Sequence, residues 1–314
     1  MSNTNFYSGM FNVSNKVDTL RSATAQSSIK VTPSTIELIK EERIPKGNVI
    51  ESAKISAVLG VKKTWELIPY CHPIPIDHVH VHLLLHESMV EITVRVESVW
   101  KTGVEMEALT GCSMAVLTVY DMLKPIDEHL SIETIRLLEK TGGKKDYIED
   151  REKKVKVAIL VISDSTFNGK RVDKSGKMII NRLHTQHNNT EVIGYEIMPD
   201  EINTVKTNLI KYSDEKRVDL IITVGGTGFS KRDITPEATK LVIERETKGI
   251  SEAIRSHGQR RTPLSMLSRG ISGLRGNTLI INLPGSTKGV SQSLDLLLPS
   301  IFHSFSMIEG KGHT

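Results

Sequence analysis

The segment of residues 102–125 carries charged side chains whose types and spacing suit proton transfer. Glu105 and Glu107 stand near its start, and Asp121 and Lys124 stand near its end. The residues between them are apolar or small, and their spacing predicts a buried helix that the final proline ends. In the simpler interpretation, the glutamates interact favourably with the helix dipole, Asp121 and Lys124 form a surface ion pair, and none of the four has a catalytic role. For all four together we favour a functional role, because charges on buried elements are rare unless they are paired or functional.

The two ends of this predicted helix are too far apart to line one small pocket. Glu107 and Asp121 are fourteen positions apart in the sequence. That spacing places them on nearly the same helix face but about 21 Å apart along the axis. If both ends serve catalysis, a symmetric dimer could bring the front of one helix near the back of another.

A proline-rich segment, L-I-P-Y-C-H-P-I-P, precedes that helix and leaves no room for helical structure. It predicts a stiff, extended loop that displays Tyr70, Cys71 and His72. A rigid loop carrying a thiol and an imidazole suits ligand contacts. A buried cysteine beside a structural histidine is an equally good interpretation.

Three histidines, His78, His80 and His82, alternate with apolar residues and predict a strand with one apolar face. Imidazoles at this spacing could bind a metal. We favour the simpler interpretation, a partly solvated strand face.

From residue 155 onward, predicted strands alternate with helices, at 155–162, 191–198, 219–224 and 278–283. Each strand ends in polar or glycine-rich residues, and open α/β sheets bind ligands at these carboxyl ends. The glycines of G-G-T-G after the third strand allow backbone amides to approach a phosphate. The segment is not a Walker A loop, because it lacks the Gly-Lys-Ser/Thr ending.

The chain of 314 residues is long enough for two domains, and its 38% hydrophobic and 25% charged residues are ordinary for a globular protein. Residues 1–146 predict an α+β domain with an antiparallel sheet and helices. Residues 155–314 predict a three-layer α/β domain with a mostly parallel sheet. Residues 147–154 lie in a run of charged residues that is typical of a solvated linker.

Several protein classes do not fit this sequence. The net charge of +4 suits anionic small molecules, and without an arginine-rich run or aromatic ladder it does not indicate nucleic-acid binding. No apolar run reaches transmembrane length, and the N-terminus lacks a signal-peptide core. Two cysteines fit a reducing compartment, so we expect a cytoplasmic protein.

Five motifs in the first half occur in one order over residues 10–145: K-G-N, L-I-P-Y-C-H-P, K-T-G-V-E-M-E-A-L-T, Y-D-M-L-K and E-K-T-G-G-K. This half resembles the cyclic pyranopterin monophosphate synthase family of molybdenum cofactor synthesis. That family converts (8S)-3',8-cyclo-7,8-dihydroguanosine 5'-triphosphate, a cyclised GTP derivative, into cyclic pyranopterin monophosphate and diphosphate. Its members are hexamers built from dimers, with active sites at dimer interfaces. The resemblance implies no tightly bound cofactor in this domain.

The resemblance implies that Asp121 is the catalytic aspartate, that Lys124 is its partner, and that Lys46 holds phosphate or assists proton transfer. It also implies a set of substrate-binding residues: Tyr70, Cys71, His72, Met106, Glu107 and Lys144. The chain has Asn12 and Asn48 where the family often has aspartate, and Tyr70 replaces a usual leucine. These departures concern the pocket rim and leave the Asp–Lys pair intact.

The second half combines S-D-S, D-K-S-G, P-D-E, G-G-T-G-F, R-D-I-T-P-E-A-T, S-M-L-S-R and N-L-P-G-S over residues 155–308. It resembles the molybdopterin adenylyltransferase family, which includes the G domain of gephyrin. That family binds molybdopterin and transfers AMP from Mg-ATP to its phosphate, and its domains are usually trimeric. A binding and oligomerisation module without chemistry is the alternative.

This second resemblance implies that Asp233 is the catalytic aspartate and that Asp200 and Asp233 hold Mg²⁺ with ATP. It implies substrate contacts from residues at the strand ends: Ser163, Asp164, Gly225, Gly226, Thr227, Gly228, Pro284, Gly285 and Ser286. We therefore predict a bifunctional molybdenum cofactor biosynthesis enzyme that forms a homo-oligomer, a trimer or a hexamer. Its partners are small molecules, namely the cyclised GTP derivative, molybdopterin and ATP, rather than nucleic acid or membrane.

Overall fold

The computed structural model of the chain describes residues 9–143, 146, 153–186 and 189–310. The chain divides into two compact units, Met1–Asp146 and Tyr147–Thr314, which are described separately below. Most of the charged segment predicted as a linker lies outside the described residues. No helix among the described residues is both long and apolar enough to cross a membrane.

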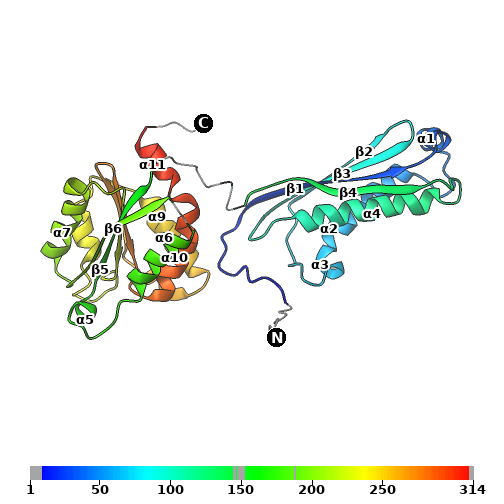
Figure 1. Cartoon of the computed structure of the whole chain (residues 1–314). Coiled ribbons are helices and arrows are strands. Elements are labelled where there is room, and N and C mark those ends of the chain that lie inside the picture. The colour runs from blue at the N-terminus through cyan, green and yellow to red at the C-terminus, as the bar shows by residue number, and fades with distance from the viewer. Residues whose placement is uncertain (1–8, 144–145, 147–152, 187–188, 311–314) are drawn as a thin grey trace, which may run out of the picture. The chain divides into compact units, whose positions relative to one another are not determined.

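The first unit is an antiparallel sheet with helices (Figure 1), and this confirms the predicted α+β fold. Its strands are β1 (Thr19–Lys30), β2 (His78–Leu85), β3 (Met89–Trp100) and β4 (Ser131–Thr141), in the order β2-β3-β1-β4. Its helices are α1 (Pro33–Lys40), α2 (Val49–Lys62), α3 (Thr64–Leu67) and α4 (Glu105–Leu123). In Figure 1, α2 and α4 lie along the same face of the sheet.

Helix α4 is the buried element that the sequence predicts, and it packs against both the sheet and α2. Ala108, Cys112 and Ala115 on α4 are fully buried against the sheet. Gly111 allows α2 to approach closely, because a Cβ at this position would lie 2.8 Å from Cγ2 of Val61. The small residues of α4 therefore allow both the sheet and α2 to pack closely against it.

Two details of the first unit differ from the sequence expectations. After the Lys46-Gly47-Asn48 turn the sequence predicts one helix through about Leu67, whereas the structure has two, since α2 ends at Lys62 and α3 begins at Thr64. The segment N-V-S-N-K-V-D-T-L-R-S-A-T-A, which the sequence predicts only to be extended, runs into β1, and this strand pairs with both β3 and β4 and so lies inside the sheet. The place of β1 in the sheet depends on tertiary pairing that local periodicity does not reveal.

The second unit has a six-stranded, mostly parallel sheet in the order β6-β5-β7-β10-β9-β8, as predicted for its fold class. Its strands are β5 (Val155–Ile162), β6 (Thr190–Met198), β7 (Leu220–Val224), β8 (Arg245–Glu246), β9 (Ser272–Arg275) and β10 (Thr278–Leu283). Strands β5, β6, β7 and β10 run parallel. The short antiparallel strands β8 and β9 were not predicted, because two to four residues carry no readable periodicity.

Helices cover both faces of this sheet, which gives three layers (Figure 1). One face packs against α6 (Ser175–Gln186), α9 (Lys248–Gln259), α10 (Thr287–Ser300) and α11 (His303–Ile308), and the other against α7 (Ile202–Ile210) and α8 (Thr235–Lys240). Short helical segments at Asp164–Phe167 (α5), Lys211–Glu215 and Pro263–Leu267 complete the unit. The strand order changes direction between β5 and β7, where open α/β sheets bind ligands.

Candidate functional sites

The carboxylate of Asp121, in the last turn of α4, lies between two lysine ammonium groups. Nζ of Lys46 donates to Oδ2 of Asp121 over 2.8 Å and to its backbone oxygen over 2.7 Å. Nζ of Lys124 lies 2.7 Å from Oδ1 of Asp121. The hydrogen bonds from Lys124 and Lys46 lower the pKa of Asp121 to about 2, and the contact with Asp121 raises the pKa of Lys124. The group therefore combines one fixed carboxylate with two cations, which suits an anionic substrate.

A second group of predicted residues lines a pocket of about 400 Å³ at the other end of α4. Tyr70, Cys71 and His72 come from the loop after α3, and Met106 and Glu107 come from the first turn of α4. The remaining lining residues are Phe11, Val13, Lys16, Ile74, Thr102, Gly103 and Glu105. Lys16 was not identified from the sequence, because it is a single lysine in a polar segment and belongs to none of the motifs. Only the structure shows that it lines the pocket.

Glu107 is a buried acidic group in this pocket and is only 3% exposed. Burial, with a smaller contribution from the charge of Glu105, raises the pKa of Glu107 to about 7. Burial and then the charge of Glu107 raise the pKa of the Cys71 thiol, which favours its protonated form. Glu107 can therefore accept and donate a proton near neutral pH, as general acid–base catalysis requires.

These two groups of residues belong to opposite ends of α4 and do not form one pocket within a chain. None of Lys46, Asp121 and Lys124 lines the pocket around Glu107. The helix between Glu107 and Asp121 is continuous, so the separation of about 21 Å applies to the folded chain. Lys144, the remaining predicted residue of this domain, lies outside the described residues.

The three histidines at positions 78, 80 and 82 lie on the exposed face of edge strand β2. Their partners on β3 are Glu97, Arg95 and Thr93. Within the described part of the chain, no cluster of three or more His, Cys, Asp or Glu side chains could hold a metal ion. The metal site considered for this strand therefore has no support.

In the second unit, a pocket of about 460 Å³ opens at the carboxyl ends of the parallel strands. Seven of the predicted residues line it: Ser163, Asp200, Gly225, Gly226, Asp233, Gly285 and Ser286. Asp164, Thr227, Gly228 and Pro284 are not among its lining residues. The pocket also holds residues that were not predicted, and these include Arg171, Lys174, Ser175 and Thr287. The signal for Lys174 and Ser175 was the D-K-S-G motif, in which the carboxylate of Asp173 caps α6 by accepting from the amides of Ser175 and Gly176.

The glycine-rich loop after β7 needs its glycines for a close backbone approach. Gly225 and Gly226 have φ angles of +99° and +61°. A Cβ on Gly225 would lie 2.3 Å from the backbone oxygen of Ile162, and one on Gly226 would lie 2.3 Å from Oγ1 of Thr235. Arg269 supports the following segment by donating to the backbone oxygens of Gly228 and Asp233. This role of Arg269 was not predicted, although the residue belongs to the S-M-L-S-R motif.

Asp200 and Asp233 each have one carboxylate oxygen held by a backbone amide. Oδ2 of Asp200 accepts from the amide of Asp164 over 2.8 Å, and Oδ2 of Asp233 accepts from the amide of Ser230 over 2.8 Å. Oδ1 of each has no hydrogen-bond partner among the residues that the structure describes. Burial and then the charges of Asp164 and Asp233 raise the pKa of Asp200. Two held carboxylates with free oxygens fit a Mg²⁺ ion that also binds phosphate oxygens and water.

A further pocket, of about 410 Å³, shares Ser286 with the one at the strand ends. Its apolar lining includes Ile254, Leu264 and Pro284. Its polar lining consists of hydroxyl, amide and ammonium side chains: Thr262, Ser265, Ser268, Ser286, Lys288, Gln292 and Ser293. This mixture suits a flat heterocycle with several hydrogen-bonding edges.

Comparison with protein-family models matches residues 10–143 to the MoaC family and residues 158–303 to a family described as "Probable molybdopterin binding domain". The molybdenum cofactor biosynthesis bifunctional protein of Chlorobaculum tepidum is 37% identical over 304 residues, which cover 97% of this chain and 96% of that protein. The cyclic pyranopterin monophosphate synthase of Aquifex aeolicus is 47% identical over 135 residues, which cover 43% of this chain and 53% of that protein. The molybdopterin biosynthesis enzyme MoaB from Thermus thermophilus, whose crystal structure is known, is 44% identical in sequence. The structural match covers 51% of this chain and 99% of the MoaB chain, with a TM-score of 0.47.

The family matches fall one on each compact unit, in the order that the motifs predict. The match to the Chlorobaculum tepidum protein extends over nearly the whole length of both chains. The chain therefore belongs to the family of bifunctional molybdenum cofactor biosynthesis proteins, with a cyclic pyranopterin monophosphate synthase domain of the MoaC family followed by a molybdopterin-binding domain.

Proposed function

We propose that the first domain converts the cyclised GTP derivative into cyclic pyranopterin monophosphate and diphosphate. The observation that carries the proposal is the carboxylate of Asp121 held between Lys46 and Lys124. Closing the cyclic phosphate requires a hydroxyl to attack the α-phosphorus while diphosphate leaves. The two ammonium groups stabilise the charge that develops on the phosphate oxygens, and Asp121 keeps both in place.

In this proposal, Glu107 rather than Asp121 transfers protons to and from the purine ring. With its pKa lowered to about 2, Asp121 stays ionised at neutral pH and is a poor proton donor. Glu107, whose pKa is about 7, exchanges protons readily under the same conditions. The pocket around Glu107 thus binds and protonates the base, while the lysines act on the triphosphate.

We further propose that each active site combines the Glu107 pocket of one subunit with the Asp121 group of another. The support is the separation of about 21 Å between the two groups on a continuous helix. A mixture of His72→Ala and Asp121→Asn chains tests this arrangement. At a one-to-one ratio, half of the dimers are mixed and one of their two sites is intact, so about a quarter of the wild-type activity should return.

The structure also supplies a matched control for that experiment. Lys46 and Asp121 contact each other within one chain, so a mixture of Lys46→Ala and Asp121→Asn chains leaves no intact site. Recovery in the first mixture alone supports the shared site. Equal recovery in both mixtures, or none in either despite proven subunit exchange, contradicts it.

We propose that the second domain transfers AMP from Mg-ATP to the phosphate of molybdopterin. An oxygen of the molybdopterin phosphate attacks the α-phosphorus of ATP, and diphosphate leaves. The nucleotide phosphates occupy the pocket at the strand ends, and the pterin occupies the neighbouring pocket that shares Ser286. Asp200 and Asp233 would hold Mg²⁺, which when bound offsets the charge of the triphosphate.

The alternative function for this domain is pterin binding without chemistry. Transfer of label from ATP to molybdopterin by the wild-type chain separates the two functions directly. Asp233→Asn should abolish that transfer while pterin binding and the melting temperature stay close to wild type. An unchanged transfer rate in Asp233→Asn removes the catalytic role, and absence of transfer in the wild type favours the binding module.

A further inference from the structure

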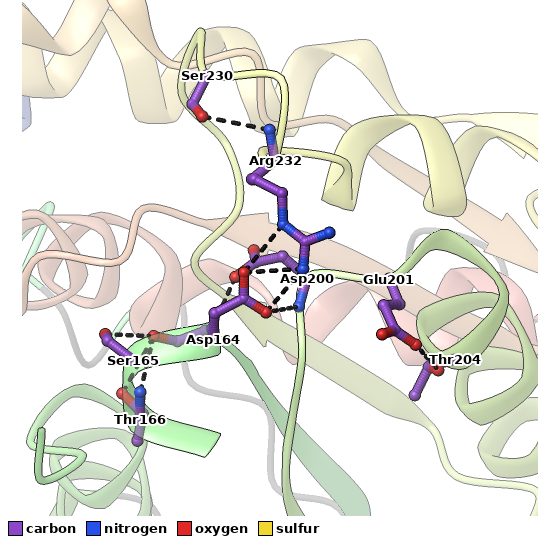
Figure 2. A network of polar contacts seen from close by, with 9 residues as sticks. Asp164, Ser165, Thr166, Asp200, Glu201, Thr204, Ser230 and Arg232 are labelled. Atoms are coloured by element: carbon purple, nitrogen blue, oxygen red, sulfur yellow. Dashed lines mark hydrogen bonds and ion pairs between the residues drawn. The ribbon is translucent and has the colours of Figure 1, made fainter. Parts of the chain in front are cut away.

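Asp164 and Asp200 hold each other through two backbone-to-side-chain hydrogen bonds, as Figure 2 shows. The amide of Asp164 donates to Oδ2 of Asp200 over 2.8 Å, and the amide of Asp200 donates to Oδ1 of Asp164 over 3.1 Å. The two residues follow neighbouring parallel strands, β5 and β6. This reciprocal pair therefore ties the two strand ends together at the edge of the pocket.

Arg232 fixes the outer side of the same pair. Its Nε donates to Oδ2 of Asp164 over 2.9 Å and its Nη2 to Oδ1 over 2.8 Å, a two-point contact visible in Figure 2. A guanidinium bound in this way sets the orientation of a carboxylate as well as its charge. Both oxygens of Asp164 are engaged, so this carboxylate, which the sequence predicts to contact substrate, is already occupied within the protein.

The carboxylate of Asp200, unlike that of Asp164, has only one of its two oxygens hydrogen-bonded within the described residues. Its Oδ2 is held by Asp164, whereas Oδ1 has no hydrogen-bond partner among the described residues and lies 3.1 Å from where a Cβ on Gly226 would stand. Asp200 lines the pocket at the strand ends, and neither Asp164 nor Arg232 does. Arg232 thus contacts Asp164, and Asp164 contacts Asp200. Oδ1 of Asp200 remains available to a ligand in the pocket that Asp200 lines.

We propose that Arg232 is a positioning residue that acts through Asp164 to orient Oδ1 of Asp200 toward a magnesium–nucleotide complex. The part that concerns Mg²⁺ rests on the proposed function of the second domain. The part that concerns Asp164 and Asp200 holds in the metal-free protein. Removal of an outer partner of a metal-binding group typically weakens metal affinity by about 10- to 100-fold, so the effect is large enough to measure.

Arg232→Lys is the informative variant, because it keeps the positive charge and removes the two-point contact. Arg275→Lys is its matched control, because Arg275 makes the same kind of two-point contact with Asp214 and lines neither pocket of this unit. Arg232 is also exposed, with 59% of its side chain accessible, so its replacement should not unfold the domain. A thermal melt of both variants checks this.

The first measurement is hydrogen exchange at the amides of Asp164 and Asp200 in the full chain without metal. We expect faster exchange at both amides in Arg232→Lys and wild-type rates in Arg275→Lys. Unchanged exchange in Arg232→Lys overturns the inference, whatever the second domain binds. This result does not depend on the proposed function.

The second measurement is the Mg²⁺ dependence of binding of α,β-methylene-ATP, an analogue that cannot release diphosphate. We expect the apparent Mg²⁺ affinity to fall by about tenfold in Arg232→Lys and to stay unchanged in Arg275→Lys. Arg232→Gln should show a similar fall. Tighter Mg²⁺ binding in Arg232→Gln would show that the guanidinium merely competes with the cation, and it overturns the inference.

A double-mutant cycle decides whether Arg232 acts through Asp164. We expect Arg232→Lys to cause no further loss of Mg²⁺ affinity once Asp164→Asn is present, because both substitutions break the same link. Additive losses mean that Arg232 contacts the phosphates directly, and they overturn the positioning role. If wild-type protein binds the analogue without any need for Mg²⁺, the proposed metal site fails, whereas the exchange result still stands.

Discussion

Replacing Glu107 with glutamine should stabilise the first domain, and the gain should appear only above the pKa of an ordinary glutamate. In the folded chain the carboxyl has a pKa of about 7 in place of 4.5. Below pH 4.5 both the folded and unfolded states are protonated, so the buried carboxyl has no electrostatic cost. As the pH rises toward 7, the unfolded state releases its proton first, and stability falls.

The size of this effect follows from the two pKa values. Their difference corresponds to about 3 kcal/mol of lost unfolding free energy once the pH is above 7. Because Glu107 is only 3% exposed, solvent screening should not reduce that figure greatly. Glu107→Gln should therefore gain about 3 kcal/mol relative to wild type near pH 8 and nothing near pH 4.

Denaturant unfolding followed by tryptophan fluorescence measures this in the full chain, because both tryptophans, Trp65 and Trp100, belong to the first unit. Glu105→Gln is the matched control from the same helical turn. Burial raises the pKa of Glu105, but the hydrogen bond and charge of Lys140, a backbone hydrogen bond and the charge of Arg21 together outweigh burial and leave the pKa lowered. Glu105→Gln should therefore lose stability near pH 8, and the loss should fade as the pH falls. An equal effect of Glu107→Gln at both pH values would refute the argument.

Three further outcomes follow from the structure. Asp121→Asn and Lys124→Ala should each lower the rate of cyclic pterin formation by about 10²- to 10³-fold in a product assay without changing the thermal melt, because each removes part of the group that stabilises phosphate charge. Gly111→Ala should destabilise the first domain by about 1–3 kcal/mol in denaturant unfolding, because the added Cβ would lie 2.8 Å from a carbon of Val61. Separate chains of residues 1–146 and 153–314 should each melt cooperatively, because each compact unit has its own apolar core. A half that shows no cooperative melt contradicts the independence of the two units.

The elements that the sequence predicted well are those whose local pattern is unambiguous. The pair Thr32-Pro33, a threonine cap followed by proline, predicts a helix start, and α1 begins there; α4 ends two residues before Pro125. The buried strands β5 and β10 match their predicted bounds, because continuous apolar runs that end in polar residues leave little choice. Seven of the residues that the family resemblance implies for the second domain line one pocket at the strand ends.

Strand β1 shows why other elements could not be predicted in this way. Its inward-facing residues include Ala23, Ala25 and Ser27, which are small because α4 lies directly over them. Oγ of Ser27 donates to the backbone oxygen of Cys112 in α4. A strand whose buried face is small and partly polar has no strong hydrophobic period, so only its pairing with β3 and β4 defines it.

The contact of Arg232 with Asp164 is a similar case within the candidate site. The two residues are 68 positions apart, and Asp164 and Asp200 are 36 apart. Motif matching identified the two aspartates as site residues, but nothing local distinguishes a carboxylate that is free from one that a neighbour already occupies. That distinction requires the sheet order, which places the ends of β5 and β6 side by side.

The two domains should differ in how their function depends on protein concentration. In the first domain, Asp121 and Glu107 stand about 21 Å apart on one helix, so the proposed active site needs a second copy of the chain. In the second domain, Asp200, Asp233 and the glycine-rich loop line one pocket within a single unit. Dilution should therefore reduce the specific activity of cyclic pterin formation at the concentration where sedimentation shows dissociation. Binding of α,β-methylene-ATP with Mg²⁺, followed over the same dilution series, should keep its affinity. If cyclic pterin formation survives in the dissociated chain, the shared site is wrong, and if nucleotide binding is lost with it, the second pocket also needs a neighbouring subunit.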